Sequence, residues 1–330
     1  MAIKANGIFL LSFFVSLIFA PLIVLFCKKI KANQTILNYV TEHKDKQGTQ
    51  TMGGLIFIVG IAITSMIFIG KDSTLAFVSI GTMLAFCVLG FLDDFIKIKF
   101  HQNEGLKPYQ KIVGQVGIST IIGYFCYTSN LIPNAILIPF SGGIMWNIGV
   151  FIIPFVIFVF LAIVNSVNLL DGLDGLCGGV SLINCVAFGI IIFFGQQSMF
   201  LQEQFNLALL CFASAGAIFC YLLFNIFPAK IFMGDTGSLA LGGLISCFAI
   251  FSGKVLYILF FGMAYVITAI SVILQVLHYK RTKKRLFLMA PIHHHFQKKG
   301  VHENKIVFIY IVSTVIICAV VILIAQFLGV

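Results

Sequence analysis

The chain alternates long apolar runs with short polar stretches, and the polar stretches hold almost all of its ionisable residues. Each apolar run approaches the roughly 20 residues that a helix needs to cross a bilayer core about 30 Å thick. The runs lack the apolar and polar alternation of membrane β-strands. We therefore predict about ten membrane-spanning helices, at approximately 7–27, 52–70, 74–92, 112–128, 148–165, 176–195, 205–224, 239–252, 255–275 and 306–328.

The composition agrees with an all-α integral membrane protein. Hydrophobic residues make up 60% of the 330 and charged residues 10%, and the mean hydropathy is +1.08, far above that of ordinary soluble domains. No boundary between soluble domains is visible. We expect a single transmembrane helical domain over 1–330, with cytoplasmic loops at about 28–51, 93–111, 166–175, 225–238 and 276–305.

Positive charges gather on one side of the predicted membrane. Eighteen of the 21 Lys and Arg residues fall in these five loops, and an excess of Lys and Arg marks the cytoplasmic loops of multi-pass proteins. The same loops hold nine of the eleven acids and all seven histidines. We predict that both termini lie outside and that an active-site cleft opens on the cytoplasmic face.

The net charge of +10 agrees with this orientation and with attraction to anionic headgroups or substrates. A nucleic-acid-binding protein would need a soluble basic domain, which the sequence lacks, so we expect no nucleic-acid partner. The nine cysteines lie mostly in apolar runs and show no metal-binding spacing. They are expected to form neither disulfides nor a zinc site.

Two adjacent carboxylates, Asp93 and Asp94, follow the third apolar run directly, with Lys97 one helical turn beyond Asp93. Adjacent carboxylates repel one another and are costly near a bilayer, so their presence favours a cation that offsets the charge. The ordinary alternative is a solvated helix end at the membrane surface.

The stretch NLLDGLDG at Asn168 places two acids and two glycines together. A spacing of three would put Asn168, Asp171 and Asp174 on one face if the segment is helical. Glycines there let the backbone approach a phosphate or a base closely. A turn followed by a helix cap is the alternative interpretation.

In FNIFPAKIFMGDTGS, beginning at Phe224, glycines and Ser238 lie just before an apolar run. Free backbone N–H groups and the helix dipole make such a helix start an anion site. Asp235 is the natural metal ligand at this place. Alternatively, Asp235 or Thr236 only caps the helix.

Three consecutive histidines, His293, His294 and His295, lie in a basic loop of about thirty residues. Imidazoles in such a loop favour metal or phosphate contact. Consecutive positions do not face the same way, so all three cannot easily bind one ion. An ordinary surface loop is the alternative.

Taken together, these stretches resemble the phospho-N-acetylmuramoyl-pentapeptide-transferase family over essentially the whole chain. DDxxK at Asp93 and NxxDGxDG at Asn168 mark the wider polyprenyl-phosphate hexose-1-phosphate transferase superfamily, and MAPIHHHFQKKG at Met289 points to this family within it. The resemblance implies a multi-pass enzyme of the bacterial inner membrane that requires Mg²⁺ and can form a homodimer. Its reaction would transfer phospho-N-acetylmuramoyl-pentapeptide from UDP-N-acetylmuramoyl-pentapeptide to undecaprenyl phosphate, giving lipid I and UMP.

The resemblance also implies roles, motif by motif. Asp235 resembles the principal Mg²⁺ ligand, and Asp93 and Asp94 resemble the pair that engages the lipid phosphate or assists its deprotonation. The remaining catalytic positions are Lys97, Lys111, His293 and His294. The implied substrate-binding positions are Lys46, Thr51, Asn168, Asp171, Leu173, Asp174, Asn225, Phe232, Gly234, Ser238 and His295, with Leu173 and Phe232 near the uracil. One departure is Gln50, where the family usually has proline in TPTMGG; it removes no catalytic group.

Two other functions are alternatives. A UDP-N-acetylhexosamine-1-phosphate polyprenyl transferase shares the superfamily motifs, but the histidine loop argues against it. An ion-coupled transporter would bury acids near mid-span, whereas Asp93, Asp171 and Asp235 fall at the ends of spans. For the transferase we favour direct displacement, because the lipid phosphate is already ionised near neutral pH. A two-step route through an aspartyl-phosphate remains open.

Overall fold

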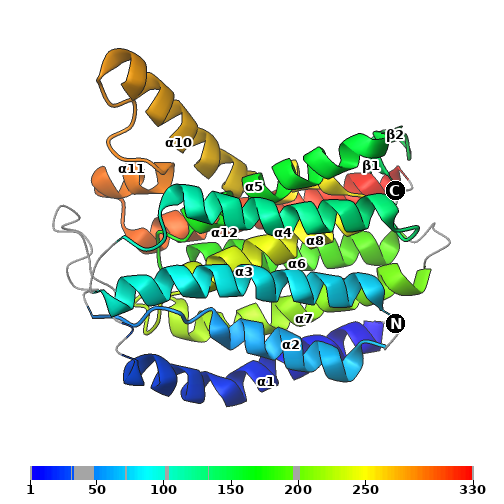
Figure 1. Cartoon of the computed structure of the whole chain (residues 1–330), viewed down its shortest axis with the longest axis horizontal. Coiled ribbons are helices and arrows are strands. Elements are labelled where there is room, and N and C mark those ends of the chain that lie inside the picture. The colour runs from blue at the N-terminus through cyan, green and yellow to red at the C-terminus, as the bar shows by residue number, and fades with distance from the viewer. Residues whose placement is uncertain are drawn as a thin grey trace.

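The structure is a computed structural model that describes residues 2–30, 32, 48–70, 73–100, 104–132, 134–195 and 201–328. Most of its helices lie side by side along one direction, and both chain ends are at the same end of the bundle (Figure 1). The elements are α1 (Ala2–Lys29), α2 (Leu55–Phe68), α3 (Thr74–Lys99), α4 (Pro108–Thr128), β1 (Ala135–Leu137), β2 (Met145–Asn147), η2 (Gly149–Phe151), α5 (Ile152–Leu170), α6 (Leu176–Phe194), α7 (Leu201–Asn225), α8 (Gly234–Phe251), η3 (Val255–Tyr257), α9 (Ile258–Phe261), α10 (Met263–Thr282), α11 (Ile292–Lys298) and α12 (Glu303–Phe327).

All ten predicted apolar runs fall on helices, and the all-α membrane class is confirmed. Within the described residues, eight helices are long and apolar enough to cross a membrane, and α2 is a shorter apolar helix of 14 residues. At 1.5 Å per residue, α2 falls short of a bilayer core about 30 Å thick. The exact number of crossings and the side on which the termini lie stay predictions.

Helix α4 has the length of a span but is more polar than the eight. One of its polar residues is Gln115, which is fully buried. Gln115 and Asn165 of α5 exchange two side-chain hydrogen bonds, of 2.7 and 3.3 Å. A polar pair of this kind satisfies both amides where water is absent, and it holds α4 against α5.

The ninth predicted run is not one straight helix. It is divided into η3, α9 and α10, with a break at Gly262, and α10 leaves the bundle at an angle (Figure 1). Hydropathy had placed the end of this run near 275, but α10 continues to Thr282. Lys280 and Arg281 in the last turn explain the difference, because they are good helix formers although they are polar.

Helix α8 lies at the centre of the bundle, and every residue from Thr236 to Phe251 is buried. Close contacts with its neighbours depend on glycine. A Cβ added at Gly242 would lie 2.6 Å from Cα of Val164 in α5, and one at Gly90 of α3 would collide with the carbonyl group of Asp235. This close approach of α3 to the start of α8 brings their polar ends together.

Candidate active site

Three aspartates from two helices meet at one end of the bundle. Asp93 and Asp94 lie near the C-terminal end of α3 and are buried, and Asp235 lies in the first turn of α8. One carboxylate oxygen of each lies within 4.8 Å of the other two. We call these residues the carboxylate cluster and this end of the bundle the carboxylate end.

Two lysines face the cluster from different helices. Lys97 Nζ lies 2.6 Å from Asp93 Oδ2, 3.0 Å from Asp235 Oδ2 and 3.8 Å from Asp94 Oδ1. Lys111 Nζ, from the first turn of α4, lies 3.0 Å from Asp93 Oδ1 and 2.5 Å from Asp235 Oδ2. Three carboxylates against two ammonium groups leave an excess of one negative charge, which favours a cation.

Asp94 also caps helix α8. Its Oδ1 accepts a hydrogen bond from the backbone N–H of Asp235 at 3.2 Å, and its Oδ2 accepts from the N–H and the hydroxyl of Thr236 at 2.9 and 2.7 Å. A carboxylate at a helix start is stabilised by the free N–H groups and the dipole. Gly234 makes the turn possible, because its φ is +72° and a Cβ there would meet Asp94 Oδ2 at 2.6 Å.

The segment before α4 covers Asp93. The backbone N–H of Leu106 donates to Asp93 Oδ1 at 2.8 Å. Gly105 lies so close that any side chain there would collide with the Asp93 carboxylate. This contact was not predicted from the sequence, because a glycine and a leucine in a loop carry no chemical signal of their own.

Asn168, at the end of α5, holds Asp235 in place. Its amide donates to Asp235 Oδ1 and to Ser238 Oγ, both at 2.8 Å. Ser238 Oγ in turn donates to the carbonyl of Gly234 at 3.0 Å. Asn168 from one predicted motif and Asp235 and Ser238 from another therefore form one connected group.

The two aspartates of the loop after α5 have different surroundings. Asp171 is half-buried, and the partial loss of water around its carboxyl group, followed by repulsion from Asp235, Asp94 and Asp174, raises its pKa to about 8. Asp174 is buried, and its Oδ2 accepts from the backbone N–H of Ala229 at 3.0 Å. Leu173 between them is also buried. Asp171 is therefore the aspartate of this loop that a ligand can reach.

Asn225 and Glu303 fix this loop from two sides. Asn225 accepts from the N–H of Gly175 at 3.0 Å and donates to the carbonyl of Ile231 at 2.9 Å, so it joins the loop to the segment before α8. Glu303 Oε1, from the first turn of α12, accepts from the N–H of Asp174 at 2.6 Å. Glu303 was not predicted from the sequence, because an acid in the first turn of a helix is an ordinary feature.

The segment before α2 docks against the segment before α8. The N–H of Phe232 donates to the carbonyl of Gln50 at 2.7 Å, and the N–H of Gly53 donates to the carbonyl of Phe232 at 2.8 Å. Thr51 is buried beside Gly234, where an added Cβ would lie 2.6 Å from Thr51 Oγ1. Thr51, Phe232 and Gly234 are thus neighbours at the carboxylate end, whereas Lys46 lies outside the described residues.

Two of the three histidines face the DGLDG loop. A Cβ added at Gly172 would lie 2.5 Å from His293 Nε2 and 2.8 Å from His294 Nε2, and the two rings are 4.4 Å apart. His295 points elsewhere, since its Nδ1 accepts from the N–H of Leu288 at 3.1 Å. As the sequence analysis expected, the three imidazoles do not face one ion.

The donor set of the carboxylate cluster fits a hard divalent cation. Mg²⁺ prefers oxygen ligands and is usually held by one or two carboxylates together with water and substrate phosphates. The Asp235 side chain is 16% exposed, against 1% for Asp93 and 4% for Asp94, so Asp235 is the most accessible carboxylate of the cluster. The ammonium groups of Lys97 and Lys111 contact the same Oδ2 of Asp235, so an ion bound at that oxygen has to displace them.

Comparison with known proteins identifies the family. Residues 75–253 match the glycosyl transferase family 4. The phospho-N-acetylmuramoyl-pentapeptide-transferase of Clostridium novyi (strain NT) is 42% identical over 310 residues, which are 94% of this chain and 93% of the relative. The chain belongs to the phospho-N-acetylmuramoyl-pentapeptide-transferase family. Proteins of the same name from Clostridioides difficile (strain 630) and Clostridium kluyveri (strain ATCC 8527) are each 41% identical, over 93% and 94% of this chain and 94% and 96% of theirs.

Membership of the phospho-N-acetylmuramoyl-pentapeptide-transferase family makes this protein an enzyme, a phosphoglycosyl transferase with several membrane-spanning helices. The segment that matches family 4 contains the whole carboxylate cluster, both lysines and the DGLDG loop. Helix α11 with its histidines lies beyond that segment but inside the region shared with the relatives. The transporter and the plain hexosamine transferase are not favoured by these relatives.

Proposed function

We propose that the protein transfers phospho-N-acetylmuramoyl-pentapeptide from its UDP carrier to undecaprenyl phosphate at the cytoplasmic face of the bacterial inner membrane, releasing UMP. The observation that carries the proposal is the convergence of the carboxylate cluster with Lys97, Lys111 and Asn168 in a chain of this family. Such a cluster suits a reaction between two phosphate groups, because both groups are negatively charged and have to be held close together with the reacting atoms in line.

Asp235 is the residue that we assign to Mg²⁺. When bound, the ion would supply positive charge that polarises the donor's phosphates. Asn168 keeps one oxygen of Asp235 oriented through its 2.8 Å hydrogen bond. Lys97 and Lys111, which contact Asp235 and Asp93, are positioned to donate to phosphate oxygens of a bound substrate.

The contacts of Asp93 and Asp94 support a direct displacement. Both oxygens of Asp94 accept hydrogen bonds from the start of α8, and Asp93 is covered by the N–H of Leu106 and two ammonium groups. A nucleophile needs a free oxygen in line with the donor phosphate. The lipid phosphate oxygen is therefore our nucleophile, and Asp93 and Asp94 orient the groups around it.

A covalent route would leave a measurable trace. If either aspartate attacked the donor phosphate, enzyme given the UDP substrate and Mg²⁺ without lipid phosphate would release a stoichiometric burst of UMP and carry the labelled sugar phosphate. We expect neither a burst nor a label by rapid-quench analysis. Isolation of an aspartyl-phosphate adduct would replace single displacement with the two-step route.

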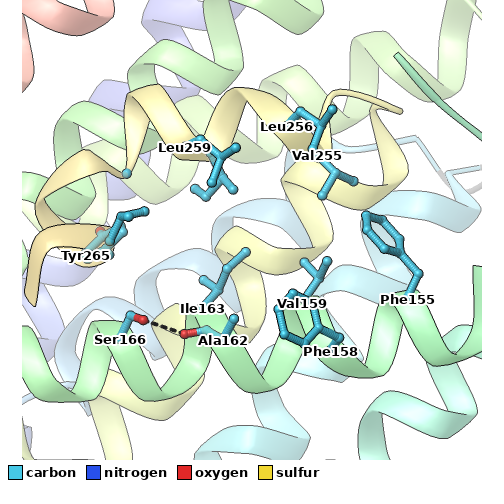
Figure 2. Close-up of a pocket in the computed structure, with 13 residues that line it drawn as sticks. Phe155, Phe158, Val159, Ala162, Ile163, Ser166, Val255, Leu256, Leu259 and Tyr265 are labelled. Carbon is cyan, nitrogen blue, oxygen red and sulfur yellow. Dashed lines mark hydrogen bonds between the residues drawn. The ribbon is translucent and has the colours of Figure 1, made fainter. Parts of the chain in front are cut away.

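An apolar cavity of about 150 Å³ between α5 and the segment from η3 to α10 is available to the acceptor's hydrocarbon chain (Figure 2). Phe155, Val159 and Leu259 line it, and Ser166 lies at one end, two residues before Asn168. An acceptor chain in this cavity would therefore run toward the residue that holds Asp235. Burial of apolar lipid surface would supply binding free energy of about 25 cal/mol per Å².

The test is a transfer assay with the full-length enzyme in vesicles that contain undecaprenyl phosphate. UDP-N-acetylmuramoyl-pentapeptide and UDP-N-acetylglucosamine are supplied separately with Mg²⁺, and UMP and the lipid-linked product are measured. We expect product from the first donor only. Product from the second donor alone would overturn the assignment, and chelation of Mg²⁺ should stop the reaction until the ion is restored.

A further inference from the structure

The hairpin of β1 and β2 lies at the end of the bundle away from the carboxylate cluster, where both chain ends also lie (Figure 1). Ile144, Met145 and Trp146 are consecutive and exposed, Trp146 to 64%. Val150 and Phe151, just before α5, are exposed as well. Water-facing hairpins normally carry charged or polar residues at such positions, because exposed apolar edges aggregate.

The connection between α4 and α5 carries no charge at all. From 112 to 170, which includes the hairpin and both helices apart from the first turn of α4, the sequence has no Asp, Glu, Lys, Arg or His. Loops that leave the membrane on the carboxylate side are strongly charged. A neutral connection is free to stay within the membrane boundary, because it has no ionised group to keep hydrated.

The hairpin is held in a fixed orientation by its inner face. The N–H of Leu137 donates to the carbonyl of Gly253 at 3.2 Å, and the ring of Phe140 lies 5.2 Å from that of Phe260. Leu137 belongs to the main core. All three residues of β2 are exposed, whereas Ile136 and Leu137 of β1, the cross-strand partners of Trp146 and Met145, are buried, so β2 forms the outer face of the hairpin.

This outer face continues the surface that the spans present to lipid. Tyr124 and Tyr127 near the end of α4, Phe151 just before α5 and Phe158 in its second turn are exposed and lie near the hairpin in the chain. Trp and Tyr concentrate at membrane interfaces because their rings are apolar at one end and hydrogen-bonding at the other. Trp146 is the only tryptophan in the chain.

We propose that the β1–β2 hairpin lies in the lipid headgroup region of the membrane, with Trp146 as its anchor, and that it does not project into water. The partner of this surface is the phospholipid leaflet at the hairpin end. The hairpin would then fix the depth of α4 and α5 in the bilayer. These two helices supply Lys111 and Asn168 to the carboxylate end.

Because Trp146 is unique, its fluorescence reports on the hairpin in the unmodified full-length protein. The protein is reconstituted into phosphatidylcholine vesicles or into vesicles of lipids brominated at a shallow or a deep chain position. We expect blue-shifted emission, little quenching by aqueous iodide, and a greater loss of fluorescence with shallow than with deep bromines. Iodide quenching without bromolipid quenching would overturn the proposal.

Two reference variants make the depth comparison internal to the protein. In a Trp146→Phe background, Phe158→Trp puts the tryptophan on the exposed face of α5 and Lys299→Trp puts it in the basic loop at the carboxylate end. Lipids brominated at the deep position should quench the tryptophan at position 158 most strongly. Aqueous iodide should quench the tryptophan at position 299 most strongly. Trp146 could also be shielded from both iodide and bromolipids, and this shielding could disappear when the protein is diluted in lipid. That result would assign the surface to contact with a second copy of the chain and would also overturn the proposal.

Discussion

At both ends of the bundle, a carboxylate from one helix accepts hydrogen bonds from the start of another. At the carboxylate end, Asp94 of α3 accepts from two N–H groups at the start of α8. At the hairpin end, Glu203 of α7 accepts from the N–H groups of Thr74 and Leu75 at the start of α3, at 2.9 and 3.0 Å. Each contact satisfies N–H groups that have no partner within their own helix.

The two ends differ in what surrounds the cap. Asp94 has Asp93 and Asp235 beside it, with Lys97 reaching all three. Glu203 takes part in no ion pair within the described ranges of the chain. A capping carboxylate alone is thus part of the architecture. Chemistry at the carboxylate end comes from the additional charges, which the cap of α8 holds together.

Asp235→Asn should have the largest effect. The substitution keeps the size of the side chain but removes the charge that Lys97 and Lys111 contact at 3.0 and 2.5 Å and that would bind Mg²⁺. We expect UMP release to fall to background at saturating Mg²⁺, while the purified variant elutes as wild type does. Near-normal transfer by the folded variant would remove Asp235 as the principal metal ligand.

The histidines of α11 should come next. Replacing both His293 and His294 with Ala removes the two imidazoles that lie against Gly172. We expect kcat/KM for UDP-N-acetylmuramoyl-pentapeptide to fall by about 10² or more, on the order of 3 kcal/mol of transition-state binding. Apparent affinity for lipid phosphate should change little. His278→Ala in α10 is the matched control, and an unchanged double variant would exclude these histidines from catalysis.

The sequence predicted the charged and amide residues of the site better than the residues that hold them in position. Asp93, Asp235 and Asn168 were each proposed from a motif, and the structure brings them into contact. Charged and amide groups stand out in an apolar chain because burying them has a cost. Gly105 and Glu303 were missed, since their contacts with Asp93 and Asp174 join segments whose approach no local pattern reveals.

The fold shows the same division between composition and geometry. Apolar length predicted where the helices are, because a bilayer sets that length. It did not predict the break at Gly262 or the angle of α10, since hydropathy measures the surroundings of a residue and not the direction of the chain. The different direction of His295 depends in the same way on the short helix α11.

Paired substitutions test the two caps directly. Glu203→Gln and Asp94→Asn each replace one of the two accepting carboxylate oxygens with an NH₂ group, which cannot accept from the helix start. Each should lower the free energy of unfolding by about 1–2 kcal/mol, measured as a lower Tm in detergent. Only Asp94→Asn should also lower transfer at temperatures where both variants are folded. Equal loss of activity would mean that the caps at the two ends do not differ in function.

The smallest effect concerns the proton on Asp171. Burial and the neighbouring carboxylates raise its pKa from 3.8 to about 8. The folded protein therefore holds this proton between these two values while the unfolded chain has lost it, so stability must fall as pH rises toward 8 and then level off. Asp171→Asn imitates the protonated form and should lack this dependence. We expect the Tm of wild type minus that of Asp171→Asn to decrease from about pH 5 to about pH 8 and to stay constant above it.

Glu203→Gln is the control, because its carboxylate lies at the hairpin end, away from the cluster. Parallel Tm curves for wild type and Asp171→Asn would mean that Asp171 is ionised throughout this range. The carboxylate end would then carry the negative charge of Asp171 in addition to the charges of the carboxylate cluster.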